Sequence, residues 1–359
     1  MCASDPRRRQ RGLSIVELMI GIVISLLVGL AASNSALVFS AMQRQGLSAG
    51  SAVVSATTTL SALKEDAAQA GLGFFGNGQY LCNALNLRVG TTDHSQAQFS
   101  PLRVTRNNGQ DQIDIFYATN VAGGANVALQ TPSALNWAEL RSYLPVDAGQ
   151  AVLLAPEAPG VPCTVRTVTA QASSTETTPQ RLTFDAAGAH NQGAAFASPA
   201  LLPIGSRVSL LGSIEWHRYA VVDGNLQLQR PMETGANANA VLVRNVVALR
   251  AQLGVMATAN GPTTVDAWVP PTTKAPSGAD WGNLAAADIG QARAIRITLL
   301  TRSPQPEKPE PRGCTATPTA PRIWGEEITP SNVGSTPWQC YRYRTSEVVV
   351  PLRNWIMGL

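Results

Sequence analysis

The side chains most often used in catalysis are few in this 359-residue sequence, and none is spaced as a catalytic set. His94, His190 and His217 lie far apart, and His217 sits in EWHRY, where a strand histidine beside tryptophan is more often structural than a ligand. GxSxG, HExxH, phosphate-binding glycine loops and EF-hand acid patterns are all absent. The segment Asp223-Gly224-Asn225 is explained as a tight hairpin turn rather than a calcium loop. The sequence therefore predicts no enzyme, no cofactor and no metal site.

The cysteines are an exception to this lack of chemically informative residues, because their number favours disulfide bonds. Cys2 precedes a long apolar run, and four others follow it: Cys82, Cys163, Cys314 and Cys340. An even number in an exported chain predicts two disulfides in an oxidising compartment. Three connectivities are possible, and the short loop favours Cys314–Cys340, which leaves Cys82–Cys163. Each would contribute about 3–4 kcal/mol in the chain-entropy model. A zinc site is disfavoured, because CxxC spacing is absent and the histidines stand far from every cysteine.

A glutamate inside an apolar segment is the most unusual feature of the chain. The run LSIVELMIGIVISLLVGLAA, residues 13–32, is long enough to span a bilayer, yet its fifth residue is Glu17. A carboxylate in hydrocarbon costs roughly 2.5–3.5 kcal/mol on insertion scales. Four arginines precede the run, so the formal net charge of +4 falls to +1 when residues 1–12 are removed. The basic charge therefore belongs to a topogenic signal that stays cytoplasmic, and it does not indicate nucleic-acid binding.

Three kinds of N-terminal segment fit parts of this pattern. A cleaved secretory signal has a shorter apolar core with no acid inside it. A plain signal anchor fits the length and the arginines but leaves Glu17 unexplained. The arrangement RQRG followed by LSIVEL resembles the class III signal of type IV pilins and type II secretion pseudopilins, although Leu13 and Ser14 replace the commoner Phe and Thr.

This resemblance implies that a prepilin peptidase cuts between Gly12 and Leu13 and methylates the new N-terminus, Leu13. It also implies that Glu17 neutralises the N-terminal amine of a neighbouring subunit as helices bundle into a filament. Electrostatics agree, because opposite charges in a low dielectric offset each other's desolvation only when they meet closely. Residues 1–12 are therefore expected to be a cleaved cytoplasmic leader.

The elements that must position Glu17 begin with a long helix. No proline occurs between residues 13 and 99, and an apolar stripe with spacings of three and four continues beyond the membrane segment: Val53, Ala56, Leu60, Leu63, Ala67 and Ala70. Lys64, Glu65, Asp66 and Gln69 are expected to face elsewhere. We expect a helix over residues 13–70, about 85 Å long, with residues 13–32 in the membrane and the stripe packed on a globular domain. Gly71 and Gly73 should end it.

Residues 71–359 read as a β-rich domain. Hairpins are predicted in RVTRNNGQDQIDIFYA and SIEWHRYAVVDGNLQLQR, and strands in 151–155, 164–171, 180–184, 292–303 and SEVVVPLRN. VLVRNVVALRAQLGV should be a strand or short helix leading into another strand, while 258–278 and the proline-rich SPQPEKPEPRGC should be loops. The predicted fold is α+β and pilin-like: a long N-terminal helix, membrane-spanning in its first half, packed on a mainly antiparallel sheet with long loops.

Motifs of this domain narrow the resemblance. KEDAAQAGLGFFG, VLVRNVVALRAQLGV, ARAIRITLLTRS and YRYRTSEVVVPLRN are similar to PilW-type minor pilins, although Gln69 replaces an arginine common before the Ala-Gly pair. The resemblance implies a structural role in initiating or capping a type IV pilus that supports twitching motility. The alternative is a J-type minor pseudopilin of a type II secretion system. A third class is an adhesin or DNA-binding module on a pilin anchor, since late aromatic residues could form an adhesion face.

The resemblance also implies partners and location. We expect contacts with other minor pilins, the major pilin, the prepilin peptidase and the inner-membrane assembly platform, with a tip adhesin as a further candidate and nucleic acid disfavoured. The chain should first cross the inner membrane once, with its N-terminus cytoplasmic and its C-terminal domain periplasmic. It should then move into a surface pilus.

Overall fold

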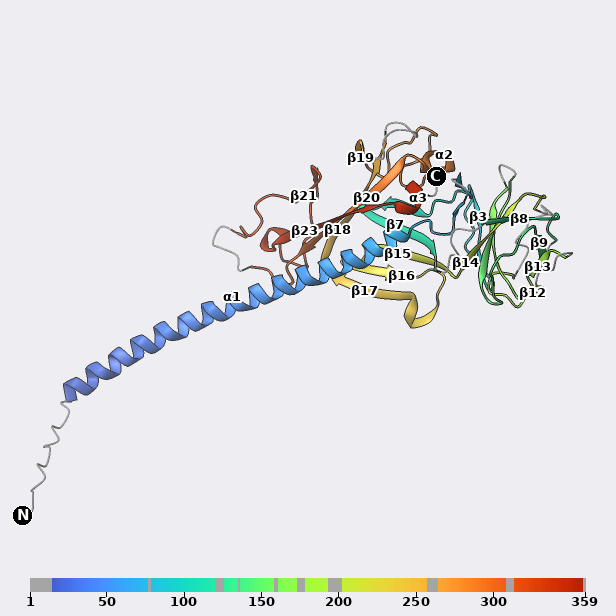
Figure 1. Cartoon of the computed structure of the whole chain (residues 1–359). Helices are drawn as coiled ribbons and strands as arrows, with labels where there is room; N and C mark the ends of the chain where they lie inside the picture. Colours follow the sequence, from blue (N-terminus) through green and yellow to red (C-terminus); the bar gives the residue numbers. More distant parts are fainter. Residues whose placement is uncertain are drawn as a thin grey trace, which may run out of the picture. The chain divides into compact units, whose positions relative to one another are not determined.

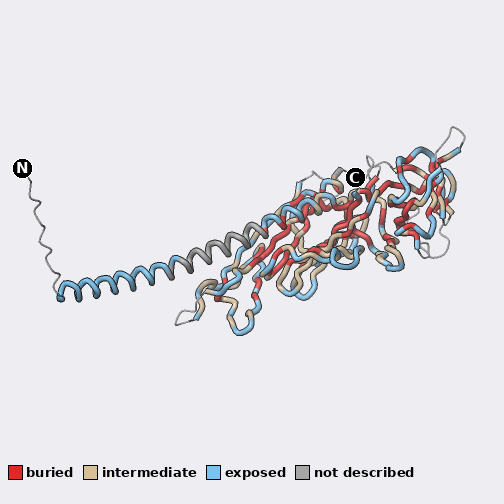
Figure 2. Tube along the Cα trace, turned by 90° about the horizontal axis from the view of Figure 1, so that it is seen from below, coloured by how far each residue is buried: buried red, intermediate tan, exposed pale blue. Residues whose placement is uncertain are grey.

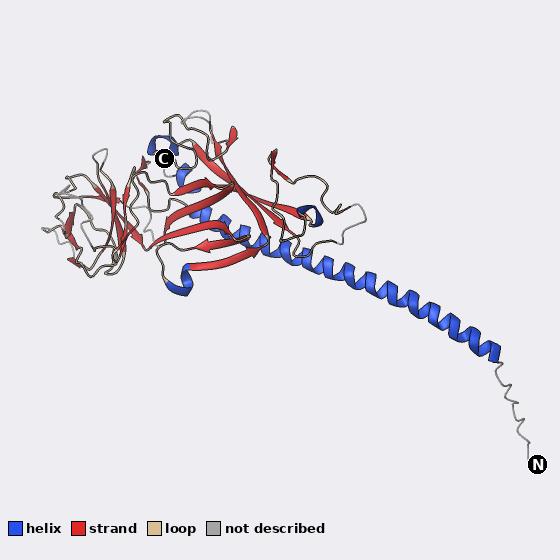
Figure 3. Cartoon of the chain, turned by 180° about the vertical axis from the view of Figure 1, so that it is seen from behind, coloured by secondary structure: helices blue, strands red, loops and turns tan. Residues whose placement is uncertain are grey.

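The structure is a computed structural model of the chain. It describes residues 15–76, 79–119, 126–134, 136–157, 161–172, 178–192, 202–256, 264–307 and 313–357, with only the backbone at 37–38 and 40–55. The chain divides into two compact units, Met1–Ser51 and Ala52–Leu359. One helix, α1 (Ile15–Gln69), runs through both, and strands make up most of the regular structure of the second unit (Figures 1 and 3).

The end of α1 is set by glycines and by a side-chain cap. Gly71 and Gly73 adopt φ values of +81° and +88°, a left-handed conformation that glycine reaches without strain. Asn354 Nδ2 donates to three carbonyl oxygens of the last turn, among them that of Gln69 at 3.0 Å. These carbonyls have no partner within the helix, so the cap satisfies them. The helix therefore stops where the glycine pair was expected to end it.

Five strands form the first antiparallel sheet, in the order β17-β16-β15-β7-β6. They are β6 (Leu102–Asn107), β7 (Gln110–Ala118), β15 (Ile214–Val222), β16 (Asn225–Gln229) and β17 (Asn239–Arg244). Both central residues of the turns Asn108-Gly109 and Asp223-Gly224 have positive φ, as in the primed turns that match strand twist. The pairing confirms both predicted hairpins.

The second antiparallel sheet has the order β19-β18-β20-β23. Its strands are β18 (Val246–Val255), β19 (Ala267–Val269), β20 (Ala292–Arg302) and β23 (Tyr343–Pro351). Segment 241–255 is a pair of strands that break at Asn245, so its helical alternative is wrong. The expectation of a loop over 258–278 is wrong at β19, because Trp268 pairs with Gly254 at the edge of the sheet.

One apolar core is shared by both sheets and by the last part of α1 (Figure 2). It contains Leu60 and Leu63 of the helix together with strand residues such as Ile115, Leu249 and Ile297. Side chains of β7 also join the sheets: Gln110 Oε1 and Asp111 Oδ2 accept hydrogen bonds from the backbone N–H groups of Leu249 (3.2 Å) and Ala251 (2.8 Å). Side chains of β7 therefore bond backbone N–H groups of β18 in the stretch that β19 does not pair.

Residues 119–213 form a lobe inserted between β7 and β15, which are neighbouring strands of the first sheet. Thr119 N donates to Ser213 O at 3.0 Å, so the lobe leaves and re-enters the sheet at adjacent points. Its two sheets have the orders β3-β11-β10-β14-β8 and β12-β13-β9 and enclose a separate apolar core. The strands are β3 (Leu85–Asn86), which precedes the lobe and joins its sheet, β8 (Asn126–Ala128), β9 (Trp137–Leu140), β10 (Ala151–Ala155), β11 (Cys163–Thr167), β12 (Ala170–Ala172), β13 (Gln180–Thr183) and β14 (Arg207–Gly212).

The single strand predicted over 164–171 is two strands in different sheets. The chain leaves β11 at Val168, whose N–H donates to Gln150 O, and enters β12 two residues later. An alternating pattern cannot show such a switch, because the alternation continues across it.

The remaining short elements are β1 (Phe75–Gly76), β2 (Gln79–Tyr80), β4 (Arg88–Val89), β5 (Thr92–Asp93), β21 (Arg322–Ile323), β22 (Glu326–Glu327), α2 (Ala286–Ile289), α3 (Arg353–Met357) and the 3-10 turns Gly235–Ala238 and Trp338–Cys340.

Two disulfides link these elements. Cys82–Cys163 ties the segment that precedes β3 to the start of β11, with Cα atoms 5.5 Å apart, and Cys314–Cys340 closes the loop that carries β21 and β22. Their loops differ in length, with sequence separations of 81 and 26. The architecture as a whole is the expected α+β arrangement of a long N-terminal helix and a mostly antiparallel β domain.

Candidate assembly site

The first part of α1 is long and apolar. Ile15–Ala36 is a 22-residue apolar span with a mean hydropathy of 2.6 and no buried share. At 1.5 Å per residue it covers about 33 Å, close to the thickness of a hydrocarbon core. By length and composition the segment can cross a membrane, and it extends four residues beyond the expected end at residue 32.

Glu17 is the only charged residue of this span and lies in the first turn of the helix. Its side chain is exposed, as are those of the neighbouring residues. Small residues follow it at every fourth position: Gly21, Ser25, Gly29 and Ser33. A Cβ added at either glycine would meet no atom within 4 Å, and the serine hydroxyls donate to backbone carbonyls of their own helix. The row that begins at Glu17 therefore leaves room for a second helix to approach closely.

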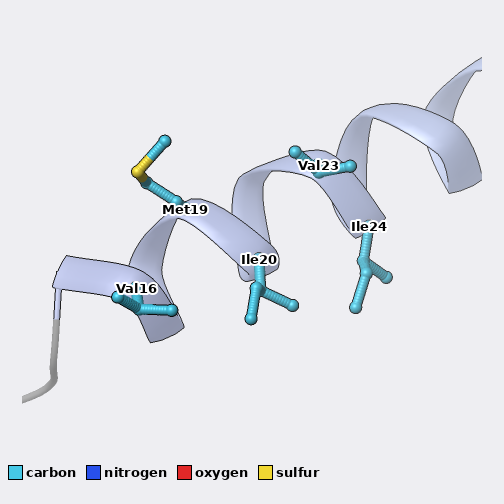
Figure 4. A pocket seen from close by; sticks show the side chains of 5 residues that line it. All are labelled: Val16, Met19, Ile20, Val23 and Ile24. Atoms are coloured by element: carbon cyan, nitrogen blue, oxygen red, sulfur yellow. The ribbon is translucent and has the colours of Figure 1, made fainter.

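Large apolar side chains line the rest of this segment. Val16, Met19, Ile20, Val23 and Ile24 surround a shallow hollow on the helix surface (Figure 4). The hollow is wholly apolar and is formed by a single helix, so it has no polar group that could orient a small ligand. Gly12 and Leu13, the predicted cleavage residues, lie outside the described residues.

The second part of α1 buries the predicted stripe. Leu63 is fully buried, Ala56, Ala67 and Ala70 are 1% exposed, and Leu60 is 5% exposed. The side chain of Val53 lies outside the described part. The stripe prediction is confirmed for the five residues that can be compared, and it explains why this half of the helix packs on its own domain.

Asp66 departs from the prediction that it faces away from the domain. Its Oδ2 lies 2.6 Å from His217 Nδ1 and accepts a hydrogen bond from the Tyr219 hydroxyl at 2.6 Å. Tyr117 adds a longer bond to Oδ1 at 3.4 Å. The expectation fails because a residue at the border of a helical stripe can reach polar groups at the edge of the core. His217 is likewise not isolated, since it joins α1 to β15.

The electrostatics of this cluster favour hydrogen bonds from neutral hydroxyls to a carboxylate. Burial, followed by the charge of Asp66, raises the pKa of Tyr219 and of Tyr117 well above the ordinary tyrosine value. Both phenols therefore stay protonated and donate. We call Asp66, Tyr117, His217 and Tyr219 the helix anchor, because they fix the rotation of α1 on the sheet. The sequence contains one signal for this cluster. Side chains alternate between the two faces of a strand, so Glu215, His217 and Tyr219 of β15 lie on the same face.

The other residues considered for chemistry have structural roles. His94 packs edge-on against Trp216 with ring centroids 5.6 Å apart, and His190 Nδ1 lies 2.6 Å from the carbonyl oxygen of Arg88. Burial lowers the pKa of both imidazoles. Asp223 lies in a hairpin turn. Within the described residues, no group of three or more His, Cys, Asp or Glu side chains could hold a metal ion.

The late aromatic residues differ in burial and contacts, and Trp338 and Tyr343 pack edge-on with ring centroids 6.5 Å apart. Trp355 is fully buried and Tyr341 is 5% exposed. Trp324 is only partly buried: its ring lies 4.3 Å from the guanidinium of Arg296, and its Nε1 donates to Glu347 at 2.7 Å. These contacts serve packing within the second unit.

Comparisons with known proteins follow the same division of the chain. Residues 7–33 match the family model of the prokaryotic N-terminal methylation motif, and residues 219–354 match that of type IV pilus-assembly protein W, PilW. These two matches together support a PilW-like type IV minor pilin. A solved type IV-like pilin from Thermus thermophilus is similar at 11% identity over 84% of this chain and 97% of that one, with a TM-score of 0.34, which is too low to add to the assignment. No curated protein sequence matches the chain.

The two matched regions leave the inserted lobe of this pilin unmatched. The PilW match begins at Tyr219 in β15, so it covers most of the C-terminal strands but none of residues 119–213. Pilins of this kind are structural rather than enzymatic proteins, and membership implies contact with other pilus components. The methylation motif and the apolar helix together indicate a membrane-anchored pilus subunit.

Proposed function

We propose that this pilin takes part in initiating or capping a type IV pilus. A prepilin peptidase cuts between Gly12 and Leu13, methylates Leu13, and frees the helix to enter a filament. The domain faces the periplasm while the N-terminus is cytoplasmic, as the arginines before the span favour. The subunit then moves from the inner membrane into the pilus.

Assembly in this proposal depends on Glu17. An exposed carboxylate in a span that is otherwise apolar needs a cation to offset its desolvation. The methylated amine of a neighbouring subunit's Leu13 supplies it, and the pairing fixes the register between helices. The row Gly21, Ser25, Gly29 supports close packing beside that pair, because small side chains let helix backbones approach.

The partners of this step are the other minor pilins, the major pilin, the peptidase and the inner-membrane assembly platform, with a tip adhesin as a further candidate. A bulky domain favours a filament end, where fewer neighbours crowd it. The domain of this subunit carries the inserted lobe in addition to the two sheets. At a position along the pilus shaft, the neighbouring subunits would have to leave room for that lobe.

The observation that carries the proposal is the 22-residue span with a single acid in its first turn. The test is to label the full chain in cells and to examine sheared pili by immunogold microscopy, with pilus counts in a deletion strain. Label at pilus ends together with a loss of pili on deletion supports the proposal. Label along the shaft, or normal pili without the gene, contradicts it. Loss of protein secretion with normal pili would instead identify the J-type pseudopilin.

A further inference from the structure

The edges of the β-sheets differ in how they are closed. β3, β8, β12 and β19 have two or three residues each, which is too short for a pairing ladder. β9 is covered by residues 128–130, through the bonds from Gln130 N to Glu139 O and from Arg141 N to Ala128 O. β6 receives a loop at Val104, whose N–H donates to Gly282 O at 2.6 Å. β17 carries a register shift against β16, which twists an edge away from pairing.

β23 has none of these protections in the part of the chain that the structure describes. It has nine residues, and its register with β20 runs without a shift from Tyr343 to Pro351. Two backbone hydrogen bonds show the alternation at the ends of β23: Ser303 N donates to Arg342 O, and Leu352 N donates to Arg293 O. The backbone groups of Arg342 and Leu352 therefore point toward the β20 side. Hydrogen-bonded pairs alternate in an antiparallel ladder, so the outward backbone groups belong to Tyr343, Thr345, Glu347, Val349 and Pro351.

These outward groups form an open ladder. No backbone or side-chain hydrogen bond reaches the main-chain N–H or C=O of these five residues among those described. Thr345, Glu347, Val349 and Pro351 are also exposed, Val349 by 48%. Pro351 sits at an outward position, where its missing N–H costs nothing, and it ends the run of donors. The edge therefore offers donors and acceptors every second residue between Tyr343 and Val349.

We propose that β23 binds the open edge strand of a different pilin subunit, which extends the β19-β18-β20-β23 sheet between molecules. Natural proteins blunt edges that must stay single, and this chain does so at every other sheet edge described above. The proposal rests on the proposed function, because subunits of a filament meet through unlike surfaces. Because the other edges described above are short, covered or interrupted by a register shift, a second copy has no further long and regular edge strand to offer in such a contact. The partner strand must come from another protein.

The side chains beside the open ladder of β23 indicate which charges the partner strand should carry. Glu347 is exposed, and Thr298 Oγ1 (3.0 Å) and Trp324 Nε1 (2.7 Å) both donate to its Oε2, whereas its Oε1 accepts no hydrogen bond among those of the described residues. Arg344 is exposed on the opposite face and has no ion pair among the described residues. A partner strand that carries a basic side chain beside Glu347 and an acidic one beside Arg344 fits both faces.

The test uses the full-length chain in cells, with a photo-crosslinking amino acid at Thr345. We expect an adduct with a pilin of different mass. Val349→Pro removes one outward N–H and leaves the bonds to β20 intact, so it should reduce the adduct by roughly fivefold or more. The matched control Val349→Ala removes the same side chain but keeps the N–H, and it should retain the adduct. Equal protease resistance of the two variants checks that the sheet is preserved.

Three results would overturn the edge proposal: an adduct with the mass of two copies, no adduct from a correctly processed chain, or equal losses in the two Val349 variants. The outcome is separable from that of the proposed function. An adduct with another pilin in membranes, from a chain that never reaches pilus ends, keeps the edge contact and removes the tip role. Label at pilus ends without an adduct keeps the tip role and removes the edge contact.

Discussion

The two ends of α1 share one secondary structure but bury their apolar side chains in different ways. Between Ile15 and Ala36 apolar residues surround the helix, and every described side chain is exposed. Between Ala56 and Ala70 apolar residues occupy a stripe that the domain covers, with charged residues such as Lys64 and Glu65 in solvent. Figure 2 shows the change from exposed to buried positions along the helix.

This difference shows which interactions belong to folding and which belong to assembly. The stripe of the second part is satisfied by contacts within the chain, including the helix anchor. The described side chains of the first part are exposed, so we expect lipid or other helices to cover them. Substitutions in the two parts should therefore affect different measurements.

The largest expected effect is at the cleavage site. Replacing Gly12 by a bulkier residue, as in Gly12→Val, should leave residues 1–12 attached, because the peptidase must fit the residue before the cut. Mass spectrometry of the membrane-extracted chain reads the result directly. Finding the processed mass in this variant would contradict the assigned cleavage position, and a wild-type chain that still contains Arg7 to Arg11 would remove the pilin mechanism.

Glu17→Ala should be processed normally but incorporated into pili at least tenfold less well, because breaking a buried charge pair costs about 3–5 kcal/mol. The ratio of pilus-bound to membrane-bound protein measures the effect. Glu65→Ala is the matched control, since it removes an exposed carboxylate from the second part of the same helix. Equal incorporation of the two variants would exclude charge pairing by Glu17.

Leu63→Ala should destabilise the domain by about 2–5 kcal/mol, because Leu63 is fully buried and its truncation leaves a cavity. Leu27→Ala in the first part should leave unfolding unchanged, because Leu27 is 62% exposed. Denaturant unfolding of the full chain in detergent compares them. A similar loss for both variants would show that the two parts do not differ as described.

The smallest effects concern the helix anchor. Asp66→Ala should cost about 1–3 kcal/mol, since it removes the Oδ2 atom that both the Tyr219 hydroxyl and His217 Nδ1 contact and leaves these groups unpaired. Tyr117→Phe should cost about 0.5 kcal/mol, because the contacts that it removes are long, 3.4 Å to Asp66 Oδ1 and 3.3 Å to His217 Nδ1. The same unfolding measurement applies. If Tyr117→Phe proved the more costly of the two, Asp66 would not be the centre of the cluster.

Sequence patterns predicted the local elements well. The helical stripe, both hairpins and the strand at 292–303 follow from spacing and turn residues, and the structure confirms them. Spacing did not predict β19 or the break between β11 and β12, because both depend on which strand lies alongside. The inserted lobe was missed for the same reason, since nothing in residues 119–213 states that β7 and β15 are neighbours.

The sequence alone determined the apolar span and the position of Glu17, because these are properties of consecutive residues and their solvent. It also determined where the helix ends, through Gly71 and Gly73. Only the tertiary structure decided that Asp66 meets His217 and Tyr219, and that β23 is left at an open edge. Those contacts join residues about 150 positions apart or depend on sheet order, and no local periodicity encodes either.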